Sequence, residues 1–343
     1  MTAHGPVVPE GTQVPARRVP LPNSVSAQAR AYLAGMLRPD GTPIPADTMY
    51  PALADAEGWI RLRQRVNAMM DQYLAPVGAM LKSSCETHII RGVTVHCATP
   101  PDGSGHAERA YLDVHGGALI YCEGEFCRVS ARRNADILDV RVYGVDYRNP
   151  PEHPYPAALD DCVAVYRALL ERYAPENLIV GGLSAGGNLA AATLLRVRDE
   201  GLPMPAAAIL LSPEADLTES GDTFVTLDGL DAAPASPLMP INLLYAAGQD
   251  LAHPYLSPLF ADFSKGFPPA FLQSGTRDKF LSNTVRLHRA LRRSRIEAEL
   301  HVFEAMPHGG FQGAPEDLEL NAEVRRFADA HWGRPSPSAR ESI

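Results

Sequence analysis

The pattern of hydrophobic and polar positions divides the chain into a helical N-terminal part and a longer part in which strands and helices alternate. Residues 1–23 show no periodic pattern and are expected to form an extended arm. Apolar residues then recur at helical spacing over 26–37 and 55–74. The second stretch carries one apolar stripe, formed by Trp59, Leu62, Val66, Met69 and Tyr73. This stripe predicts a helix that packs against a core, and such a helix could also cover a cleft.

From about Glu86 onward, short apolar runs bounded by glycine, proline and polar residues predict β-strands. The expected strands are 88–97, 110–114, 140–147, 178–180, 206–211, 270–273 and 297–303. The expected helices among them are 157–173, 188–195, 283–293 and 318–331, and 212–268 is expected to be mostly irregular. Because strand and helix alternate from residue 178 onward, the predicted fold class is α/β, a mostly parallel sheet flanked by helices. In such a sheet the reactive groups lie beyond the C-terminal ends of the strands.

Composition narrows the possible partners and the compartment. A net charge of −9 without a basic stripe argues against nucleic acid, whose binding depends on neutralising phosphates. The five cysteines form no C-x-x-C motif, and an odd number of them favours a reducing compartment. The N-terminus lacks the apolar core of a signal peptide, and no segment reaches the ~20 apolar residues that span a bilayer. A cytoplasmic protein with no membrane partner is therefore expected.

The most informative stretch is the glycine-rich turn between the predicted strand 178–180 and the next helix. It reads Gly182-Leu183-Ser184-Ala185-Gly186, which is the G-x-S-x-G pattern of a nucleophile elbow. A strand that turns abruptly into a helix strains the central serine, and only residues without a Cβ atom fit two positions to either side. The pattern predicts a serine hydroxyl at the sheet edge, close to a helix N-terminus. Plain strand–helix turns also contain this pattern, so the rest of the chain decides its meaning.

A second glycine turn follows a predicted strand and reads His115-Gly116-Gly117-Ala118. Small residues let this backbone fold tightly and present its N–H groups. An acyl-transfer enzyme needs such donors to hold an oxyanion, together with the N–H of the residue after the nucleophile, here Ala185. The candidate oxyanion-hole residues are Gly116, Gly117, Ala118 and Ala185. We expect His115 to brace the loop and to take no part in proton transfer.

Two further polar residues follow predicted strands. Asp278 lies in the turn after the strand 270–273, and His308 lies in the turn after the strand 297–303. A carboxylate at the first position can orient an imidazole, and a histidine at the second can act as the general base. The order Ser184, Asp278, His308 is that of α/β-hydrolases. Asp278 could instead cap the next helix.

Two other carboxylates are rival candidates for the catalytic acid. Glu214 and Asp216 lie past the end of the strand that precedes the strand of Asp278. Either side chain would also be near the C-terminal edge of a parallel sheet. Asp278 is the preferred acid, and Glu214 and Asp216 remain its rivals.

Taken together, the motifs resemble the hormone-sensitive-lipase-like group of α/β-hydrolases, which are bacterial carboxylesterases with an H-G-G-G motif. The resemblance covers most of residues 85–330. In addition, the run from Tyr147 to Asp161 closely follows the family pattern Y-R-L-A-P-E-H-P-F-P-A-A-L-D-D. The chain departs from the family at Ala118, where the third motif glycine is usual. It departs again at Leu183, where an acidic or hydroxyl residue is usual, and after Asp278, where relatives often have Pro-Leu.

The resemblance also implies a domain organisation. It assigns 81–333 to an α/β-hydrolase catalytic domain and 1–80 to an arm and cap helices. The insertion 213–268 would contribute to the cap, and 334–343 would form a disordered tail. No cofactor and no metal are implied.

The motifs and the resemblance together indicate a serine carboxylesterase that works through an acyl-enzyme. Short-to-medium esters in solution are the expected substrates, and the same residues would open a lactone. A ligand-binding protein on a hydrolase scaffold is a less favoured alternative, because such proteins normally lose the triad. A metal-dependent hydrolase is weaker still, because no H-E-x-x-H motif occurs. A homodimer is an open possibility.

Overall fold

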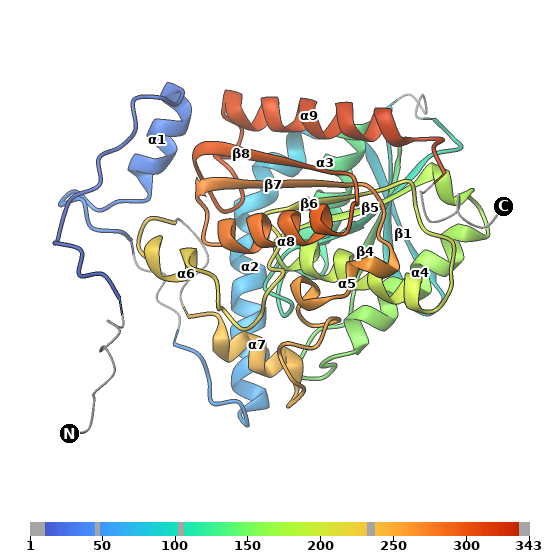
Figure 1. Cartoon of the computed structure of the whole chain (residues 1–343), viewed down its shortest axis with the longest axis horizontal. Coiled ribbons are helices and arrows are strands. Elements are labelled where there is room, and N and C mark those ends of the chain that lie inside the picture. The colour runs from blue at the N-terminus through green and yellow to red at the C-terminus, as the bar shows by residue number, and fades with distance from the viewer. Residues whose placement is uncertain (1–10, 45–48, 102–105, 232–236, 336–343) are drawn as a thin grey trace, which may run out of the picture.

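An eight-stranded β-sheet runs through the centre of the protein (Figure 1). The computed structural model describes residues 11–44, 49–101, 106–231 and 237–335. The strands are β1 (Ser84–Ile90), β2 (Val93–Thr99), β3 (Ala110–Val114), β4 (Arg141–Asp146), β5 (Leu178–Leu183), β6 (Ala207–Leu211), β7 (Ala270–Arg277) and β8 (Ala298–Pro307). Their order in the sheet is β1-β2-β4-β3-β5-β6-β7-β8. The strand β2 runs antiparallel to both of its neighbours, β1 and β4, and the other five pairs are parallel, so the expected α/β fold with a mostly parallel sheet is confirmed.

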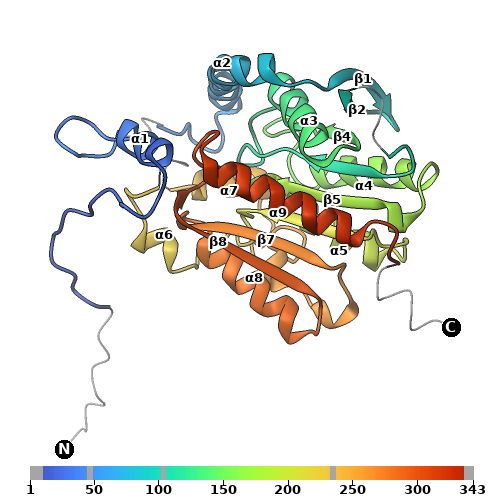
Figure 2. The same cartoon turned by 90° about the horizontal axis from the view of Figure 1, so that it is seen from above.

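Helices cover both faces of this sheet (Figures 1 and 2). One face carries α1 (Ala27–Gly35), α3 (Glu125–Leu138) and α9 (Pro315–His331), and the other carries α4 (Ala157–Leu170), α5 (Ala185–Asp199) and α8 (Leu281–Arg293). Successive side chains of β5 point to opposite faces of the sheet, and they are apolar, so helices must cover both faces. Leu178 and Val180 pack into the core under α4, α5 and α8, whereas Ile179 packs into the core under α3 and α9.

A third group of elements lies outside the sheet and its two helical layers. It contains α2 (Ala56–Met80), α6 (Thr223–Thr226) and α7 (Met239–Ala246). Side chains from α2, from the loop after β3 and from the start of α7 form one apolar cluster, which we call the cap cluster. Its buried members are Trp59, Leu62, Ile120, Tyr121, Cys122, Leu238, Ile241 and Phe280. The helix α2 and the 213–268 insertion therefore contact each other beside the loop that follows β3.

The short helical turns lie in the connections between larger elements. They are 3-10 turns at Pro175–Asn177, Pro258–Phe260 and Phe263–Lys265. Two of these, together with α6 and α7, lie within the insertion that the sequence predicts to be mostly irregular. The insertion thus contains more regular structure than its hydrophobic pattern predicts.

The prediction of a single strand over 88–97 is wrong. The structure has a hairpin there, β1 and β2, joined by a two-residue turn at Arg91 and Gly92. Both residues have positive φ, of 50° and 84°, and this turn type matches the twist of paired strands. Apolar character continues on both sides of the turn, so only the Arg-Gly pair signals the break.

The helix α3 is missing from the elements predicted from the sequence. Its buried side chains include Cys127, Ala131, Ala135 and Leu138, which are spaced by four, four and three residues. That spacing is a helical signal, but small and sulfur-containing residues carry it in place of large aliphatic ones. The helix is needed on geometric grounds, because β3 and β4 are parallel neighbours and require a crossover.

The helix α2 is longer than expected, because it continues through Pro76 to Met80. Packing of its apolar stripe is confirmed for Trp59 and Leu62, which are buried. It is wrong for the other end of the stripe, where Met69 is 59% exposed and Tyr73 is 50% exposed. The stripe therefore contributes to the cap cluster through Trp59 and Leu62, with Val66 packed against them.

The ends of the chain contribute little regular structure. Residues 11–22 form neither helix nor strand, in agreement with the expected arm. Residues 1–10 and most of the predicted tail, 336–343, lie outside the described residues. In the part of the chain that is described, no helix has the length and apolar character that a bilayer crossing requires.

Candidate active site

Ser184 occupies the turn between β5 and α5. Its φ is +62°, a conformation that residues other than glycine seldom adopt. Gly182 and Gly186 permit this turn because each lies against the Val114 carbonyl oxygen. A Cβ atom would lie 2.4 Å from that oxygen at Gly182 and 2.0 Å from it at Gly186. The two glycines are therefore required by close backbone contact, for the reason that the sequence predicts.

The structure brings His308 to this serine. His308 directly follows β8, and its Nε2 atom lies 2.9 Å from the Ser184 Oγ atom. On the other side of the ring, Nδ1 lies 3.3 Å from the Asp278 Oδ1 atom. The imidazole thus lies between a hydroxyl and a carboxylate, and one ring nitrogen faces each of them.

Asp278 is fully buried at the end of β7 and is held by several donors. The Ser274 hydroxyl donates to its Oδ2 at 2.6 Å, and the Phe280 N–H donates to its Oδ1 at 2.9 Å. The alternative role of Asp278 as a helix cap is not observed. The helix α8 begins at Leu281. Its N-cap residue is Phe280, whose side chain makes no capping hydrogen bond.

Neither rival carboxylate reaches His308. The Asp216 carboxylate accepts hydrogen bonds from Thr218, Ser220 and Arg286, which hold it away from the triad. The Glu214 carboxyl is buried, and neither of its oxygens forms a hydrogen bond with any residue that the structure describes. Burial raises the pKa of Glu214 to about 8.

Charges around the triad set its protonation. Burial by itself lowers the pKa of His308, but the hydrogen bond and charge of Asp278, with the charges of Asp231 and Glu214, raise it above its ordinary value. Burial by itself raises the pKa of Asp278, but the His308 hydrogen bond and charge lower it below its ordinary value. The pair therefore favours an ionised carboxylate beside an imidazole that accepts a proton readily.

Asp231 is the residue that sequence analysis missed. It lies in the insertion, and its carboxylate accepts hydrogen bonds from the backbone N–H groups of His308 and Lys279. No motif or periodic pattern surrounds it in the sequence. Its proximity to the triad is evident only from the folded chain.

The loop after β3 lies directly against the elbow. A Cβ atom at Gly116 would lie 3.0 Å from the Leu183 carbonyl oxygen, and one at Gly117 would lie 2.3 Å from the Tyr121 carbonyl oxygen. Gly117 has a φ of +120°, and the residue after it, Ala118, has a φ of +50° despite its side chain. The substitution of alanine for the usual third glycine is thus accommodated in a left-handed conformation.

The backbone donors of this loop and of the elbow are free to bind a ligand. Within the described ranges, no acceptor is hydrogen-bonded to the N–H groups of Gly117, Ala118 or Ala185. Ala185 is the first residue of α5, where the N–H groups of a helix have no partner within the helix. Such groups can stabilise an oxyanion, and the positive end of the helix dipole adds to the effect.

His115 is buried beneath this loop. Its Nδ1 lies 2.7 Å from the Gly116 carbonyl oxygen, and its ring stacks on Tyr147 with centroids 4.1 Å apart. The Tyr147 hydroxyl in turn donates to the His115 carbonyl oxygen at 3.0 Å. Burial lowers the pKa of His115, so the ring is neutral near pH 7. These contacts suit the expected role of His115 in bracing the loop.

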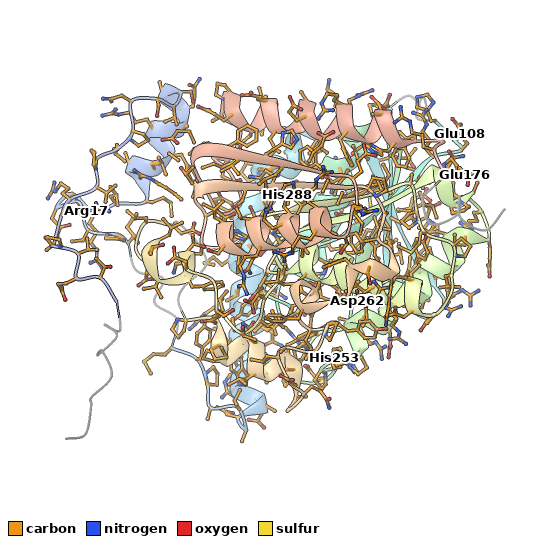
Figure 3. The ribbon with its side chains drawn as sticks, in the orientation of Figure 1. Arg17, Glu108, Glu176, His253, Asp262 and His288 are labelled. Atoms are coloured by element: carbon orange, nitrogen blue, oxygen red, sulfur yellow. The ribbon has the colours of Figure 1, made fainter. Side chains whose placement is uncertain are left out.

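Other histidines lie away from the triad. His288 lies on α8 and His253 lies in the loop after α7, both toward the outside of the protein (Figure 3). His301 lies on β8, where its ring stacks on Phe271. None of these residues occupies the end of a parallel strand beside the elbow.

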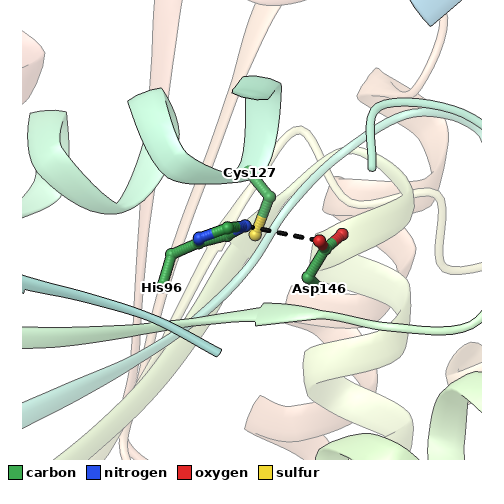
Figure 4. Close-up of side chains that lie close together, drawn as sticks. All are labelled: His96, Cys127 and Asp146. Carbon is green, nitrogen blue, oxygen red and sulfur yellow. Dashed lines mark hydrogen bonds and ion pairs between the residues drawn. The ribbon is translucent and has the colours of Figure 1, made fainter. Parts of the chain in front are cut away.

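One group of potential metal ligands occurs among the described residues, formed by His96, Cys127 and Asp146 (Figure 4). The His96 ring and the Asp146 carboxylate already have hydrogen-bond partners. The His96 ring lies 3.3 Å from Asp146 and 3.0 Å from the Thr87 hydroxyl, and Asp146 accepts the Gly124 N–H at 3.0 Å. Burial raises the pKa of Cys127 well above its ordinary value, which disfavours the thiolate that a metal would bind. We interpret the group as a hydrogen-bonded support for the start of α3.

Comparison with known proteins agrees with this geometry. A family model described as the α/β-hydrolase fold matches residues 111–312. An acetyl-hydrolase of Streptomyces hygroscopicus is 36% identical over 241 residues, which cover 68% of this chain and 73% of that protein. The crystal structure of an esterase is 32% identical, covers 94% of this chain and 99% of its own, and has a TM-score of 0.85. An esterase from the bacterial hormone-sensitive lipase family is 29% identical with a TM-score of 0.75, and the match covers 90% of this chain and 99% of that one. The chain therefore belongs to the α/β-hydrolase family and, within it, to the hormone-sensitive-lipase-like group of carboxylesterases.

Proposed function

We propose that the protein hydrolyses carboxylic esters with Ser184 as nucleophile, His308 as general base and Asp278 as the acid that orients the base. One observation carries this proposal. The imidazole of His308 has Nε2 2.9 Å from the Ser184 hydroxyl and Nδ1 3.3 Å from the Asp278 carboxylate. This is the arrangement that activates a serine in acyl transfer.

In the first half of the reaction, Nε2 of His308 takes the hydroxyl proton while Oγ of Ser184 attacks the ester carbonyl carbon. The carbonyl oxygen becomes an oxyanion, which accepts hydrogen bonds from the N–H groups of Gly117, Ala118 and Ala185, while Gly116 shapes the loop. His308 then gives its proton to the leaving alcohol, and an acyl-enzyme remains. The first residue of α5 is one of the donors, so the helix dipole favours the same charge.

In the second half, a water molecule takes the place of the alcohol. His308 removes a proton from it, the hydroxide attacks the acyl carbonyl, and the acid and Ser184 are released. A lactone would follow the same steps, except that its leaving alcohol stays attached to the acyl group. Lactone hydrolysis is therefore a second substrate class for the same residues.

The cap cluster suggests the size of the substrate. It packs directly against Ala118 of the proposed oxyanion hole, and its side chains come from α2, from the loop after β3, from α7 and from the turn after β7. Apolar walls of this kind favour uncharged acyl groups. The acetyl-hydrolase name of one relative also suggests short acyl chains. We propose short-to-medium esters in solution as substrates, without activation at a lipid surface.

Two measurements test these proposals. A fluorophosphonate probe should label the wild-type protein at Ser184 and leave the Ser184→Ala variant unlabelled, because labelling requires an activated serine. An unlabelled wild type would favour the ligand-binding alternative. A panel of p-nitrophenyl esters of graded chain length, measured beside several lactones, then ranks the substrates. A sharp rise in rate at the solubility limit of the longer esters would indicate a lipase and contradict the proposed substrate range.

A further inference from the structure

Asp231 connects the two turns that carry the base and the acid. Its Oδ1 accepts the backbone N–H of His308 at 3.0 Å, and its Oδ2 accepts the backbone N–H of Lys279 at 2.7 Å. Lys279 immediately follows Asp278, so the single carboxylate bridges the ends of β7 and β8. Bonds from N–H donors to an ionised carboxylate are about twice as strong as those between neutral groups. The Lys279 ammonium lies elsewhere, 2.8 Å from Asp228.

The segment that carries Asp231 is itself attached to the acid turn. The Thr223 hydroxyl donates to the Lys279 carbonyl oxygen at 2.6 Å and accepts the Ser282 N–H at 2.9 Å. One residue later, the Phe224 ring packs edge-to-face on Phe280, with centroids 5.6 Å apart. The start of the segment is therefore held on the turn that follows Asp278. At its other end, the segment reaches the turn of His308 through Asp231.

Asp231 also adds a negative charge beside the base. The titratable groups that face His308 are Asp278 from β7, Glu214 from the loop after β6, and Asp231 from the insertion. The charge of Asp231 also acts on the Tyr32 hydroxyl of α1. Burial raises the pKa of Asp231 to about 6, and the negative charge of Asp278 acts in the same direction, whereas the His308 charge and the two backbone N–H groups oppose that rise. Near pH 7 and above, the side chain is therefore mostly ionised.

We propose that Asp231 is a positioning residue for the esterase reaction: from the insertion, its carboxylate holds the turns of Asp278 and His308 in register. The inference rests on the proposed triad. Loss of the charge alone should destabilise the protonated form of His308. Loss of both acceptors should also leave the two turns less firmly held relative to each other. Misplacement of a base by about 1 Å costs about a hundredfold in rate.

Four variants separate these effects. Asp231→Asn removes the charge but keeps one oxygen acceptor, and Asp231→Ala removes both acceptors. Asp231→Glu keeps the charge on a longer side chain. Asp222→Asn is the matched control, because Asp222 is an exposed aspartate of the same insertion and its side chain forms no capping hydrogen bond. Circular dichroism and thermal unfolding establish that each variant is folded.

The decisive readout is the pH dependence of kcat/KM on a p-nitrophenyl ester. For Asp231→Asn we expect its midpoint to fall by about 0.5 to 1 pH unit, because an acidic neighbour that favoured the imidazolium is gone. We expect kcat to fall about tenfold in Asp231→Asn and about a hundredfold in Asp231→Ala, with KM changed less than twofold. Asp231→Glu should keep the wild-type midpoint, and Asp222→Asn should match the wild type in both measurements.

A folded Asp231→Asn variant with the wild-type midpoint and kcat would overturn the inference. So would an equal shift in Asp222→Asn, because the effect would then come from net charge. If Asp231→Asn does not fold, Asp231→Ser replaces it under the same criteria, since serine keeps an acceptor without a charge. The fluorophosphonate label keeps the two proposals apart. An unlabelled wild type contradicts the triad itself, whereas a labelled wild type with an unaltered Asp231→Asn variant contradicts only the role of Asp231.

Discussion

The Nε2 atom of His308 lies 2.9 Å from the Oγ atom of Ser184, although the two residues are 124 positions apart in the chain. Each follows the C-terminal end of a parallel strand, β8 and β5 respectively. Because parallel strands all end at the same edge of a sheet, their loops can bring distant residues into contact. Four predictions follow the consequences of this contact and of the charges around it.

Ser184→Ala should abolish turnover and leave the fold intact. The alanine keeps the backbone of the elbow but cannot form an acyl-enzyme, so kcat should fall about 10⁴-fold or more. Esterase assays on a highly purified variant measure the loss, and circular dichroism checks the fold. A variant that keeps a tenth of the wild-type rate would rule out Ser184 as the nucleophile.

Substitution of the acid distinguishes Asp278 from its rivals. Asp278→Asn should lower kcat by a factor approaching 10⁴, because the amide cannot stabilise the protonated imidazole. Glu214→Gln and Asp216→Asn serve as matched controls, since each removes a carboxylate that forms no hydrogen bond with His308. Their effects on kcat should be milder. A larger loss from Glu214→Gln than from Asp278→Asn would assign the acid to the loop after β6.

The rate should increase with pH through the titration of His308. The imidazole accepts the serine proton only when it is neutral, and Asp278 is the main neighbour that raises its pKa against the effect of burial. The midpoint of kcat/KM against pH should therefore lie above about 6.5, the ordinary value for histidine. Any residual activity of Asp278→Asn should have a lower midpoint. A wild-type midpoint below the ordinary histidine value would contradict the electrostatic description.

Glu214 should make stability depend on pH. Burial raises its pKa to about 8, whereas an unfolded glutamate titrates near 4.3. Between these values the folded protein holds a proton that the unfolded chain lacks. This group therefore lowers the free energy of unfolding as pH rises, by up to about 1.4 kcal/mol per pH unit. Glu214→Gln removes that dependence. The free energy of unfolding of this variant, relative to that of the wild type, should therefore rise from pH 5 to pH 8.

Urea unfolding at several pH values measures the difference in the free energy of unfolding between Glu214→Gln and the wild type. The matched control is Glu319→Gln, which replaces an exposed glutamate of α9. Its stability relative to the wild type should change little with pH, because this side chain is exposed in the folded protein. A constant difference between Glu214→Gln and wild type across this range would contradict a raised pKa.

Much of the fold follows from local signals in the sequence. The elbow is an example, because Gly182 and Gly186 are needed wherever a strand turns directly into a helix around a serine. The boundaries of β3 were predicted at both ends, since a short apolar run bounded by polar and glycine residues is a local pattern. Where the local signal is weak, as in α3, the sequence predicts no element, and where it is continuous, as across the β1–β2 hairpin, the predicted single strand is wrong.

The sequence by itself determined which residue types follow each strand and in what order they occur, because hydrophobic period and glycine content act over a few neighbouring positions. The tertiary structure decided which of those residues meet. Asp278 is hydrogen-bonded to His308 whereas Glu214 is not, and the difference depends on the pairing of β6, β7 and β8. Asp231 reaches the same histidine from an insertion that has no pattern of its own. Contacts of this kind join segments far apart in the chain, so their distances and the resulting pKa values depend on the packing of the whole sheet.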